Sequence, residues 1–374
     1  MERTSTWSME SPAAHRTPKY RRVRAMNEEI EVPVDDRYSR HMLFSPIGLE
    51  GQRKLGQAKV AIVGLGALGT VLANHMVRAG VGYVRLIDRD FVEASNLQRQ
   101  MLYEEADAQE SVPKAIAAAQ KLQRINSLIQ IVPHVIDLNS TNALELLSDV
   151  DLILDGTDNF SVRFLINDVS IVTGTPWIYG GAVASRGVSL TIIPGTTPCL
   201  RCLFANAPAQ GSTETCDTAG VIGGIIHVVA SYQATEALKL LVGDTSNLNR
   251  KMQQWDLWYN QTSAIDVTAA RKKDCPACGL QHLEYLEAEL DETIQSLCGR
   301  NSVQIHPVHH LPLELEQWEV RLSPLGPVSR NRFLLKFQPS PELTLILFPD
   351  GRVLIQGTSD MTAAKSLYSR YIGN

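Results

Sequence analysis

The chain of 374 residues has few cysteines, no long hydrophobic run and no strong excess of one charge. Six cysteines are too few for disulfide bonds to be the main support of a chain of this length. The formal net charge of -5 gives no support for general nucleic-acid binding, and no apolar run reaches the length of a transmembrane helix. The N-terminal residues have no hydrophobic signal core. We therefore expect a cytoplasmic protein without nucleic-acid or membrane partners.

The composition that is present is ordinary for a globular protein, with 44% apolar and 20% charged residues. The length allows one large α/β domain and a smaller second one. We expect a disordered tail over residues 1–35, a main domain over 36–280 and a small α+β domain over 281–374. A transit peptide at the N-terminus is the alternative to the tail, but Glu2 and Glu10 interrupt it.

A strand, a glycine turn, a helix and a second strand open the main domain. Lys59–Val63 is apolar and leads directly into Gly64-x-Gly66-x-x-Gly69, and Tyr83–Ile87 ends at Asp88. This order predicts a parallel sheet, and a segment near Val188–Ile193 indicates an antiparallel section. The fold class is therefore α/β, a Rossmann-like parallel-to-mixed sheet with flanking helices. In the small domain, three strands and two helices are predicted: Phe333–Phe337, Leu343–Phe348, Val353–Gln356, Leu311–Leu322 and Ala363–Tyr371.

The glycine turn predicts a nucleotide site. Glycines let phosphate oxygens approach backbone N–H groups at the positive end of a helix. A carboxylate at the end of the next strand, here Asp88, can bind ribose hydroxyls. Tight packing alone is the structural alternative, and at this point NAD and ATP fit equally well.

Two cations favour ATP over NAD. Arg99 lies in the segment Asn96–Gln100, and Lys114 begins a helix. Nucleotidyl transfer needs positive charge near the phosphates, whereas hydride transfer does not. Asp158 follows a buried strand and could coordinate Mg²⁺. The alternatives are solvated surface charges for the cations and a helix N-cap for Asp158.

Several further motifs occur in a fixed order, and together they resemble one enzyme family. The set is Asp36–His41, Gly64–Gly69, Asp88-x-Asp90, Ser95–Gln100, Arg124–Asn126, Asp155–Asn159, Arg163 with Asn167, and Tyr179–Ala182. It resembles the bacterial adenylyltransferases that activate ubiquitin-fold sulfur carriers, which are relatives of the ubiquitin-activating enzymes. The resemblance covers about residues 36–280.

The resemblance implies a homodimer with ATP and Mg²⁺ in a Rossmann-like crevice. It places the nucleotide at Gly64, Gly66, Ala67, Gly69, Asp88, Ser95, Asn96, Leu97, Gln98, Arg99, Lys114, Asp158 and Asn159. Ala67 lies where many family members have glycine. The contact implied at this position is made by a backbone N–H, which alanine also provides. The implied catalytic residues are Arg99, Lys114, Asp158 and, reaching the partner subunit's ATP, Arg40. The stretch between Gln100 and Lys114 is slightly longer than usual.

The implied reaction joins AMP to the C-terminal carboxylate of a carrier that ends in Gly-Gly. A separate sulfur donor, such as a cysteine desulfurase, would then attack the acyl adenylate. The 281–374 segment resembles the extension of some thiazole-biosynthesis members, which favours the thiamine pathway over molybdenum cofactor synthesis. An NAD-dependent oxidoreductase and a non-catalytic binding module are the rival interpretations.

Four cysteines form two C-x-x-C pairs, Cys199 with Cys202 and Cys275 with Cys278. Two such pairs can close a tetrahedral Zn²⁺ site, and the family resemblance implies structural zinc. A redox dithiol and unrelated core cysteines are the alternatives. A fifth cysteine, Cys216, lies in a loop rich in Thr before a predicted helix start. It is a candidate nucleophile, or simply a small residue near a helix end.

Overall fold

A computed structural model describes residues 20–25, 28–33, 36–206, 216–288, 293–297, 301–306 and 313–373. Its main body contains an eight-stranded sheet with the strand order β10-β9-β8-β7-β6-β3-β4-β5. Strands β3 to β7 are parallel, and β8, β9 and β10 continue the sheet in antiparallel pairs. The strands are Lys59–Val63, Tyr83–Ile87, Gln130–His134, Leu152–Asp155, Trp177–Val183, Arg186–Ile192, Lys251–Asp256 and Gln261–Asp266 for β3 to β10. The predicted Rossmann-like mixed sheet is confirmed.

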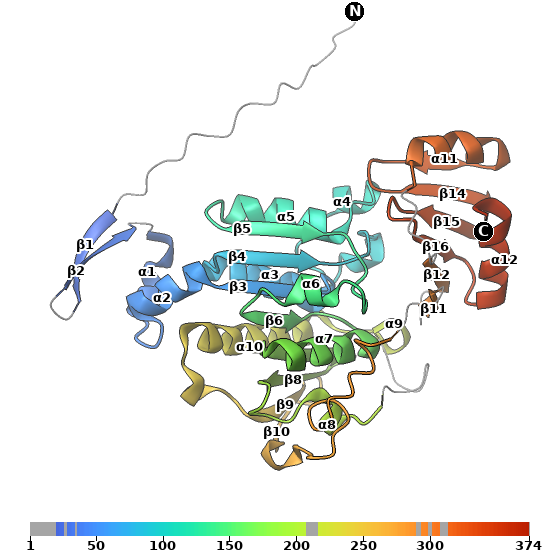
Figure 1. Ribbon diagram of the computed structural model, residues 1–374. Coiled ribbons are helices and arrows are strands. Elements are labelled where there is room, and N and C mark those ends of the chain that lie inside the picture. Colours follow the sequence, from blue (N-terminus) through green and yellow to red (C-terminus); the bar gives the residue numbers. More distant parts are fainter. Residues whose placement is uncertain are drawn as a thin grey trace, which may run out of the picture.

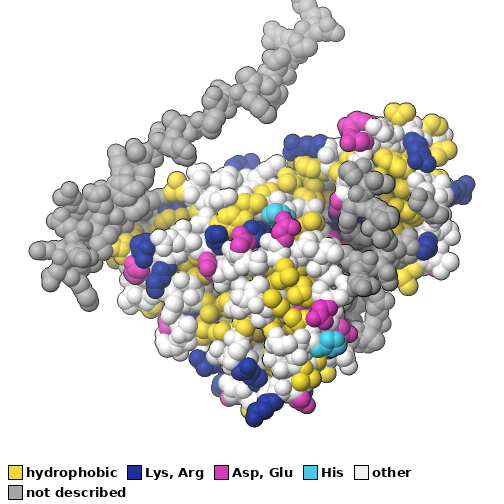
Figure 2. Space-filling view, in the orientation of Figure 1, with side chains coloured by type: hydrophobic (Ala, Val, Ile, Leu, Met, Phe, Trp, Pro, Cys, Tyr) yellow, Lys and Arg dark blue, Asp and Glu magenta, His cyan; other side chains and the backbone are white. Residues whose placement is uncertain are grey.

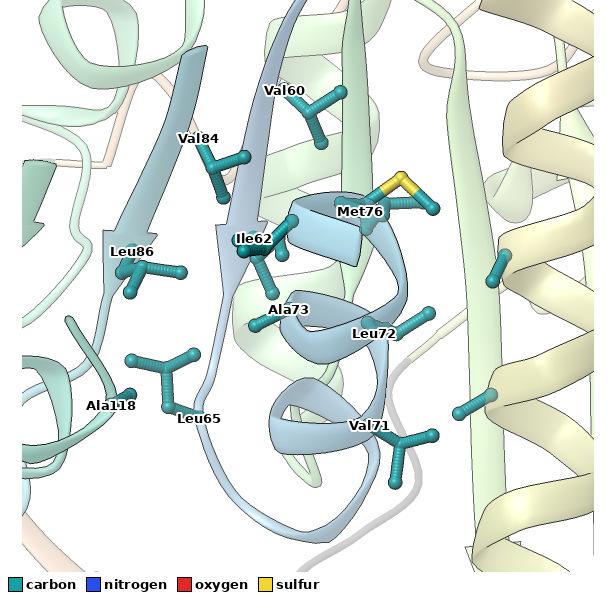
Figure 3. Packing of buried hydrophobic residues seen from close by; sticks show 14 of the residues in the cluster. Val60, Ile62, Leu65, Val71, Leu72, Ala73, Met76, Val84, Leu86 and Ala118 are labelled. Carbon is teal, nitrogen blue, oxygen red and sulfur yellow. The ribbon is translucent and has the colours of Figure 1, made fainter. Parts of the chain in front are cut away.

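Helices cover both faces of this sheet (Figure 1). On one face, α3 (Ala67–Ala79), α5 (Lys114–Ile125) and α10 (Gly223–Val242) bury an apolar cluster against β3, β4 and β6. Figure 3 shows Met76 of α3 on the side of Val60 and Ile62 of β3, and Val71 on the side that faces α10. Burial of these side chains contributes roughly 1.5–3 kcal/mol each.

The opposite face is covered by α6 (Ala143–Leu147) and α7 (Phe160–Thr173). Alternate residues of β3 point to the two faces, so Ala61 and Val63 belong to this second cluster. Three short helices lie in connections: α4 (Glu105–Gln109), α8 (Leu200–Leu203) and α9 (Cys216–Ala219). Within the described residues, no helix is both long and apolar enough to span a membrane.

A second sheet with six antiparallel strands follows, in the order β11-β12-β16-β15-β14-β13. Its strands are Thr293–Leu297, Ser302–His306, Val328–Arg330, Leu335–Ser340, Leu343–Leu347 and Val353–Gln356 for β11 to β16. Helices α11 (Leu315–Leu322) and α12 (Met361–Tyr371) pack on it through the third apolar cluster. This C-terminal sheet, as β11–β16 are called below, has three more strands than the sequence predicts. Residues 281–288 pack with the main body, through Leu283, Tyr285 and Leu286, so the proposed boundary at 280 stays a prediction.

The N-terminal arm lies at the amino edge of the main sheet, and the C-terminal sheet lies beside the carboxyl edge (Figure 1). The arm contains α1 (Ser39–Leu43) and α2 (Gly48–Gln57). An antiparallel pair, β1 (Tyr20–Ala25) with β2 (Glu28–Pro33), lies within the segment for which a disordered tail is predicted. Residues 1–19 of that segment lie outside the described residues.

Candidate nucleotide and metal sites

The glycine turn joins β3 to α3 and packs directly against the loop after β6. A Cβ on Gly69 would lie 1.8 Å from the carbonyl oxygen of Gly64, and one on Gly156 would lie 2.5 Å from the same oxygen. Gly64 also has a left-handed φ of +81°. At Gly66, by contrast, a Cβ would meet only the Gln100 side chain, at 3.9 Å. The backbone at Gly66, the N-cap of α3, is therefore open to a ligand.

Asp88 follows β4, and two backbone N–H groups hold its carboxylate. Oδ2 accepts a hydrogen bond from Leu65 N in the glycine turn at 2.6 Å, and Oδ1 accepts one from Asp90 N at 2.7 Å. The buried Lys114 places Nζ 3.2 Å from Asp90 Oδ2. Burial raises the pKa of the Asp88 carboxyl, while the positive charge of Lys114 acts in the opposite direction. The Asp90–Lys114 pair therefore lies beside Asp88 at the carboxyl edge of the sheet.

The segment Ser95–Gln100 forms a tight turn beside these residues. The Asn96 side chain is buried, and its Oδ1 accepts a hydrogen bond from Glu93 N at 3.1 Å. Arg99 is half-buried and donates from Nη1 to the Ser95 carbonyl at 2.9 Å. Asn96 therefore shapes the turn that presents Ser95 and Arg99. Leu97 is half-buried and Gln98 is exposed in the same turn.

A buried ion pair fixes the loop after β6. Arg163 Nε lies 3.0 Å from Asp155 Oδ2, and Arg163 Nη2 donates to the carbonyls of Thr157 and Gly180 at 2.6 and 2.9 Å. The amide of Gln233 on α10 also donates to the Asp155 carbonyl, at 3.0 Å. Three elements, α7, β7 and α10, thereby hold the loop in one conformation.

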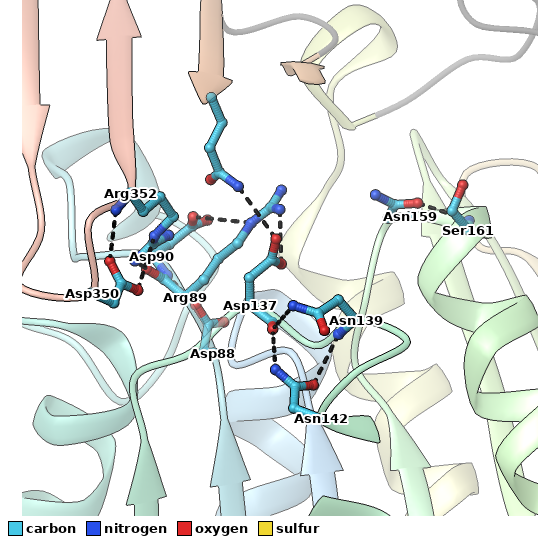
Figure 4. Close-up of polar contacts among 11 residues, drawn as sticks. Asp88, Arg89, Asp90, Asp137, Asn139, Asn142, Asn159, Ser161, Asp350 and Arg352 are labelled. Carbon is cyan, nitrogen blue, oxygen red and sulfur yellow. Dashed lines mark hydrogen bonds and ion pairs between the residues drawn. The ribbon is translucent and has the colours of Figure 1, made fainter. Parts of the chain in front are cut away.

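Asp158 lies in this loop with an exposed side chain. Asn159 is the N-cap of α7, where its Oδ1 accepts a hydrogen bond from Ser161 N at 2.8 Å (Figure 4). The N-cap interpretation of Asp158 is therefore wrong. The cap on the next residue leaves the Asp158 carboxylate at the surface of the carboxyl edge.

Arg89 directly follows Asp88 and was not singled out from the sequence. Its Nη1 lies 2.9 Å from Asp137 Oδ1, and its Nε lies 3.8 Å from Asp90 Oδ1 (Figure 4). Burial disfavours the charged guanidinium, but the surrounding carboxylates outweigh it and raise the pKa of Arg89. These carboxylates belong to Asp137, Asp90 and Asp158. The edge therefore carries several charges of both signs within a short distance.

Arg40 lies at the other end of the main body. It is exposed on α1, which follows Tyr38 directly. The Tyr38 ring covers Gly80 at the C-terminal end of α3, and its hydroxyl accepts a hydrogen bond from Asn126 Nδ2 at 2.7 Å. Helix α3 is about 20 Å long, and Gly66 lies at its opposite end. The structure therefore does not bring Arg40 together with the other predicted nucleotide residues of its own chain.

The four cysteines of the two C-x-x-C pairs come together, and their sulfur atoms all lie within 4.8 Å of one another. The separations are 3.8 Å for Cys199 to Cys202, 3.6 Å for Cys199 to Cys275, and 3.5 Å for Cys202 to Cys278. A disulfide needs about 2.05 Å. Four thiolates about 2.3 Å from one Zn²⁺ would be about 3.8 Å apart. The cluster therefore has the dimensions of a tetrahedral metal site.

The gap between the two pairs is closed by α7. Asn167 on this helix accepts a hydrogen bond from Leu200 N at 2.8 Å, which fixes the first pair. The second pair is followed by Tyr285, whose ring stacks on Phe164 of α7 with the ring centroids 4.9 Å apart. A Cβ on Gly279 would lie 2.3 Å from the Lys273 carbonyl oxygen, so the turn after Cys275 requires glycine.

Comparison with known proteins identifies the family. Residues 38–277 match the ThiF family. The chain belongs to this family. It is 43% identical to the ThiF-family protein named sulfur carrier protein ThiS adenylyltransferase of Bacillus subtilis strain 168, over 90% of this chain and 99% of that protein. It is 39% identical to the sulfur carrier protein adenylyltransferase of Thermus thermophilus, over 65% of this chain and 90% of that one.

The ThiF-family fold is also found in solved structures. The crystal structure of E. coli MccB with ATP has a TM-score of 0.57 to this chain and 23% sequence identity. It covers 66% of this chain and 75% of the MccB chain. This likeness supports the fold of the main body.

Among the residues of the ThiF-family chain that the sequence did not single out, Gly156 and Tyr103 also shape the site. Gly156 packs on Gly64, and the buried Tyr103 hydroxyl donates to the Leu65 carbonyl at 2.8 Å. Gly156 could have been found from its place between Asp155 and Asp158. Tyr103 carries no comparable signal. Cys216 begins α9, but its side chain lies outside the described residues, so its role stays a prediction.

Proposed function

We propose that this protein uses ATP to adenylylate the C-terminal glycine carboxylate of a ubiquitin-fold sulfur carrier. The observation that carries the proposal is the meeting, at one edge of the sheet, of the glycine turn, Asp88, Lys114 and the Asp158 loop. Open parallel sheets bind their ligands at this carboxyl edge. Membership of the ThiF family and the adenylyltransferase names of its relatives support the same reaction.

The chemistry needs positioning and charge more than proton transfer. The carrier carboxylate attacks the α-phosphate of ATP, the bond to pyrophosphate breaks, and carrier-CO-AMP results. The carboxylate is already a nucleophile, so no general base is required. We assign the ribose to Asp88 and the phosphates to Arg99, Lys114 and the backbone at Gly66 and Ala67. Fixed cations in a partly buried site stabilise the developing phosphate charge better than water does.

Asp158 would hold Mg²⁺, because an exposed carboxylate beside a triphosphate site is the hard oxygen ligand that this ion takes. The ion supplies positive charge to the phosphate oxygens. Asn159 caps α7 and so positions Asp158 rather than binding through its own Oδ1. Any contact of Asn159 with the nucleotide would then be made by atoms other than Oδ1.

The cysteine cluster would hold one Zn²⁺ with four protein thiolates. Four protein ligands leave no open coordination position, so this metal is structural. It would join the turn after β8 to the segment after β10. Neighbouring cysteines that form no disulfide are typical of a reducing compartment. We therefore place the protein in the cytoplasm.

The carrier of thiamine (thiazole) synthesis is the proposed substrate. The match to the ThiS adenylyltransferase covers 90% of the chain and therefore extends into the C-terminal sheet. Purified protein should catalyse ATP–pyrophosphate exchange that depends on a thiazole-pathway carrier ending in Gly-Gly. A carrier with its last glycine removed is the control. Exchange that occurs only with a molybdopterin-pathway carrier would assign the protein to molybdenum cofactor synthesis instead. Binding of NAD instead of ATP would refute the proposed reaction.

Cys216 would act after adenylation. A thiolate or persulfide can displace AMP from the acyl adenylate, whereas formation of the adenylate needs no thiol. Cys216→Ser should therefore keep pyrophosphate exchange while it slows sulfur transfer from a donor such as a cysteine desulfurase. Loss of exchange would instead place Cys216 in the adenylation site, and full sulfur transfer would leave it without a role.

A further inference from the structure

The C-terminal sheet contacts the segment that carries Asp88, and one buried arginine makes the central contact. Arg352 directly precedes β16 and is 1% exposed. Its Nη2 donates to the carbonyl oxygen of Arg89 at 2.7 Å, across 263 positions of the chain (Figure 4). Its Nε lies 3.5 Å from Asp350 Oδ2, so Arg352 is paired both with this carboxylate and with the Arg89 carbonyl. Arginine is almost never fully buried unless it is paired.

The Arg89 carbonyl and the Asp90 N–H belong to the same peptide group. Arg352 holds the oxygen of this peptide at 2.7 Å, and Asp88 Oδ1 accepts from its nitrogen at 2.7 Å. A cation on the carbonyl polarises the peptide and strengthens the N–H as a donor. Since Asp88 Oδ2 is bound to Leu65 N, a continuous hydrogen-bond chain runs from Arg352 through Asp88 to the glycine turn.

Apolar contacts surround this chain of hydrogen bonds. Phe91, the next residue but one after Arg89, is buried in a cluster with Ile346 and Leu354 of the C-terminal sheet and with Leu334 and Phe348, which directly flank its strands β14 and β15. The Arg352 guanidinium carbon also lies 3.9 Å from the centroid of the Phe348 ring. Exclusion of water makes the Arg352 hydrogen bond stronger than an exposed one.

Two further contacts reach neighbouring parts of the same site. Gln304 on β12 donates to Asp137 Oδ2 at 3.3 Å, and Asp137 is the carboxylate that pairs with Arg89. Lys336 on β14 donates to Ser111 Oγ at 2.6 Å, three residues before Lys114. The C-terminal sheet therefore contacts the segments on both sides of the Asp90–Lys114 pair.

We propose that the C-terminal sheet is a working part of the nucleotide site and that Arg352 is a positioning residue for the ribose carboxylate of Asp88. This inference rests on the proposed ATP site. Arg352 would act on the site through the peptide that orients Asp88. By linkage, nucleotide binding and the docking of the C-terminal sheet then strengthen each other.

The test is recognition of the ribose hydroxyls, because a purely structural arginine would not change it. Arg352→Met keeps the apolar stem and loses the charge, and Arg352→Lys restores a charged donor. Exchange kinetics would be measured with ATP and with 2′,3′-dideoxy-ATP. We expect Arg352→Met to raise KM for ATP about tenfold, the effect of one lost charged hydrogen bond, with a smaller change for the dideoxy nucleotide. Arg352→Lys should recover part of the difference.

The matched control is Arg330→Met, because Arg330 on β13 of the C-terminal sheet pairs with Glu316 and Glu319 on the adjacent helix α11. It should leave both KM values unchanged. An unchanged preference for ATP over the dideoxy nucleotide in Arg352→Met would overturn the inference. Absence of exchange in the wild-type protein would instead refute the proposed function.

Hydrogen exchange on the wild-type protein tests the inference without any variant, in case Arg352→Met does not fold. Addition of Mg²⁺ and a non-hydrolysable ATP analogue should slow exchange at the amides of Val353–Gln356 in β16 as well as at the glycine turn. Protection of the glycine turn with none in β16 would show that the C-terminal sheet is uncoupled from the site.

Discussion

Arg163 and Asp155 form a buried ion pair beneath the loop that carries Asp158, with Nε 3.0 Å from Oδ2. Arg163→Met would leave the Asp155 carboxylate buried without its partner. We expect the free energy of unfolding to fall by about 3–5 kcal/mol, as measured by urea denaturation. Arg53→Met, which breaks the exposed pair with Glu50, is the control and should unfold close to wild type. Equal stability of the two variants would contradict this account.

The sequence predicts the parallel half of the fold well, because its signals are local. Lys59–Val63 and the following glycines specify a buried strand and a tight turn within a few residues. The antiparallel strand β10 carries no such signal, since all residues of Gln261–Asp266 are exposed and show no alternation of apolar side chains. Of the three unpredicted strands of the C-terminal sheet, β13 has only three residues, but β12 alternates the buried Val303 and Ile305 with polar residues and so carries a strand signal.

In the candidate site, the sequence predicts which residues gather at the carboxyl edge, but it does not predict the structural role of each one. Asp158 and Asn159 both suit a helix N-cap, and only the backbone decides that Asn159 takes it. The bond from Arg352 to Arg89 joins residues too far apart for any local pattern. Arg40 is a third case, because its place at the amino edge becomes clear only from the packing of Tyr38 on Gly80.

The buried carboxyl of Asp168 on α7 makes stability depend on pH. Its Oδ2 accepts a hydrogen bond from Tyr285 N at 3.0 Å, and burial raises its pKa from 3.8 to about 6. The contribution of Asp168 to stability is therefore fully present below pH 3.8 and is lost as the pH rises through about 6. Asp168→Asn keeps an acceptor for Tyr285 N but does not titrate.

When the pH rises from about 5 to about 7, the wild type should lose about 1 kcal/mol of unfolding free energy relative to Asp168→Asn, because only the wild type titrates at this position. Denaturation curves of both proteins at the two pH values, with zinc in excess, measure this. A difference between the two proteins that stays the same at both pH values would show that Asp168 does not titrate in this range.

The cysteine cluster should contain roughly one zinc per chain. Cys199→Ser removes one of the four ligands and should lower both the zinc content and the melting temperature, because metal binding and folding of such a site are coupled. Metal analysis and thermal unfolding measure the two effects, and a chelator should reproduce the second in the wild type. A zinc-free wild-type protein of equal stability would rule out the site.

Arg40 lies far from Gly66 within one chain, so the role that the family resemblance implies for it requires a dimer in which it reaches the partner subunit's site. Arg40→Ala and Asp158→Ala should each be inactive alone. In a mixed dimer, one site would carry both substitutions and the other would carry neither, so part of the activity should return. Two tags on the two variants would allow mixed dimers to be isolated and assayed. Isolated mixed dimers without exchange activity would argue against a contact from the partner subunit.

The most direct test of the adenylyltransferase function is carrier-dependent ATP–pyrophosphate exchange by Asp158→Ala. Its side chain is exposed, so the variant should fold and melt like the wild type, while exchange falls about 100-fold or more through loss of the proposed Mg²⁺ ligand. Glu145→Ala, an exposed acidic residue on α6, is the control and should exchange at the wild-type rate. Wild-type exchange by Asp158→Ala would contradict the assignment of Asp158 to the reaction.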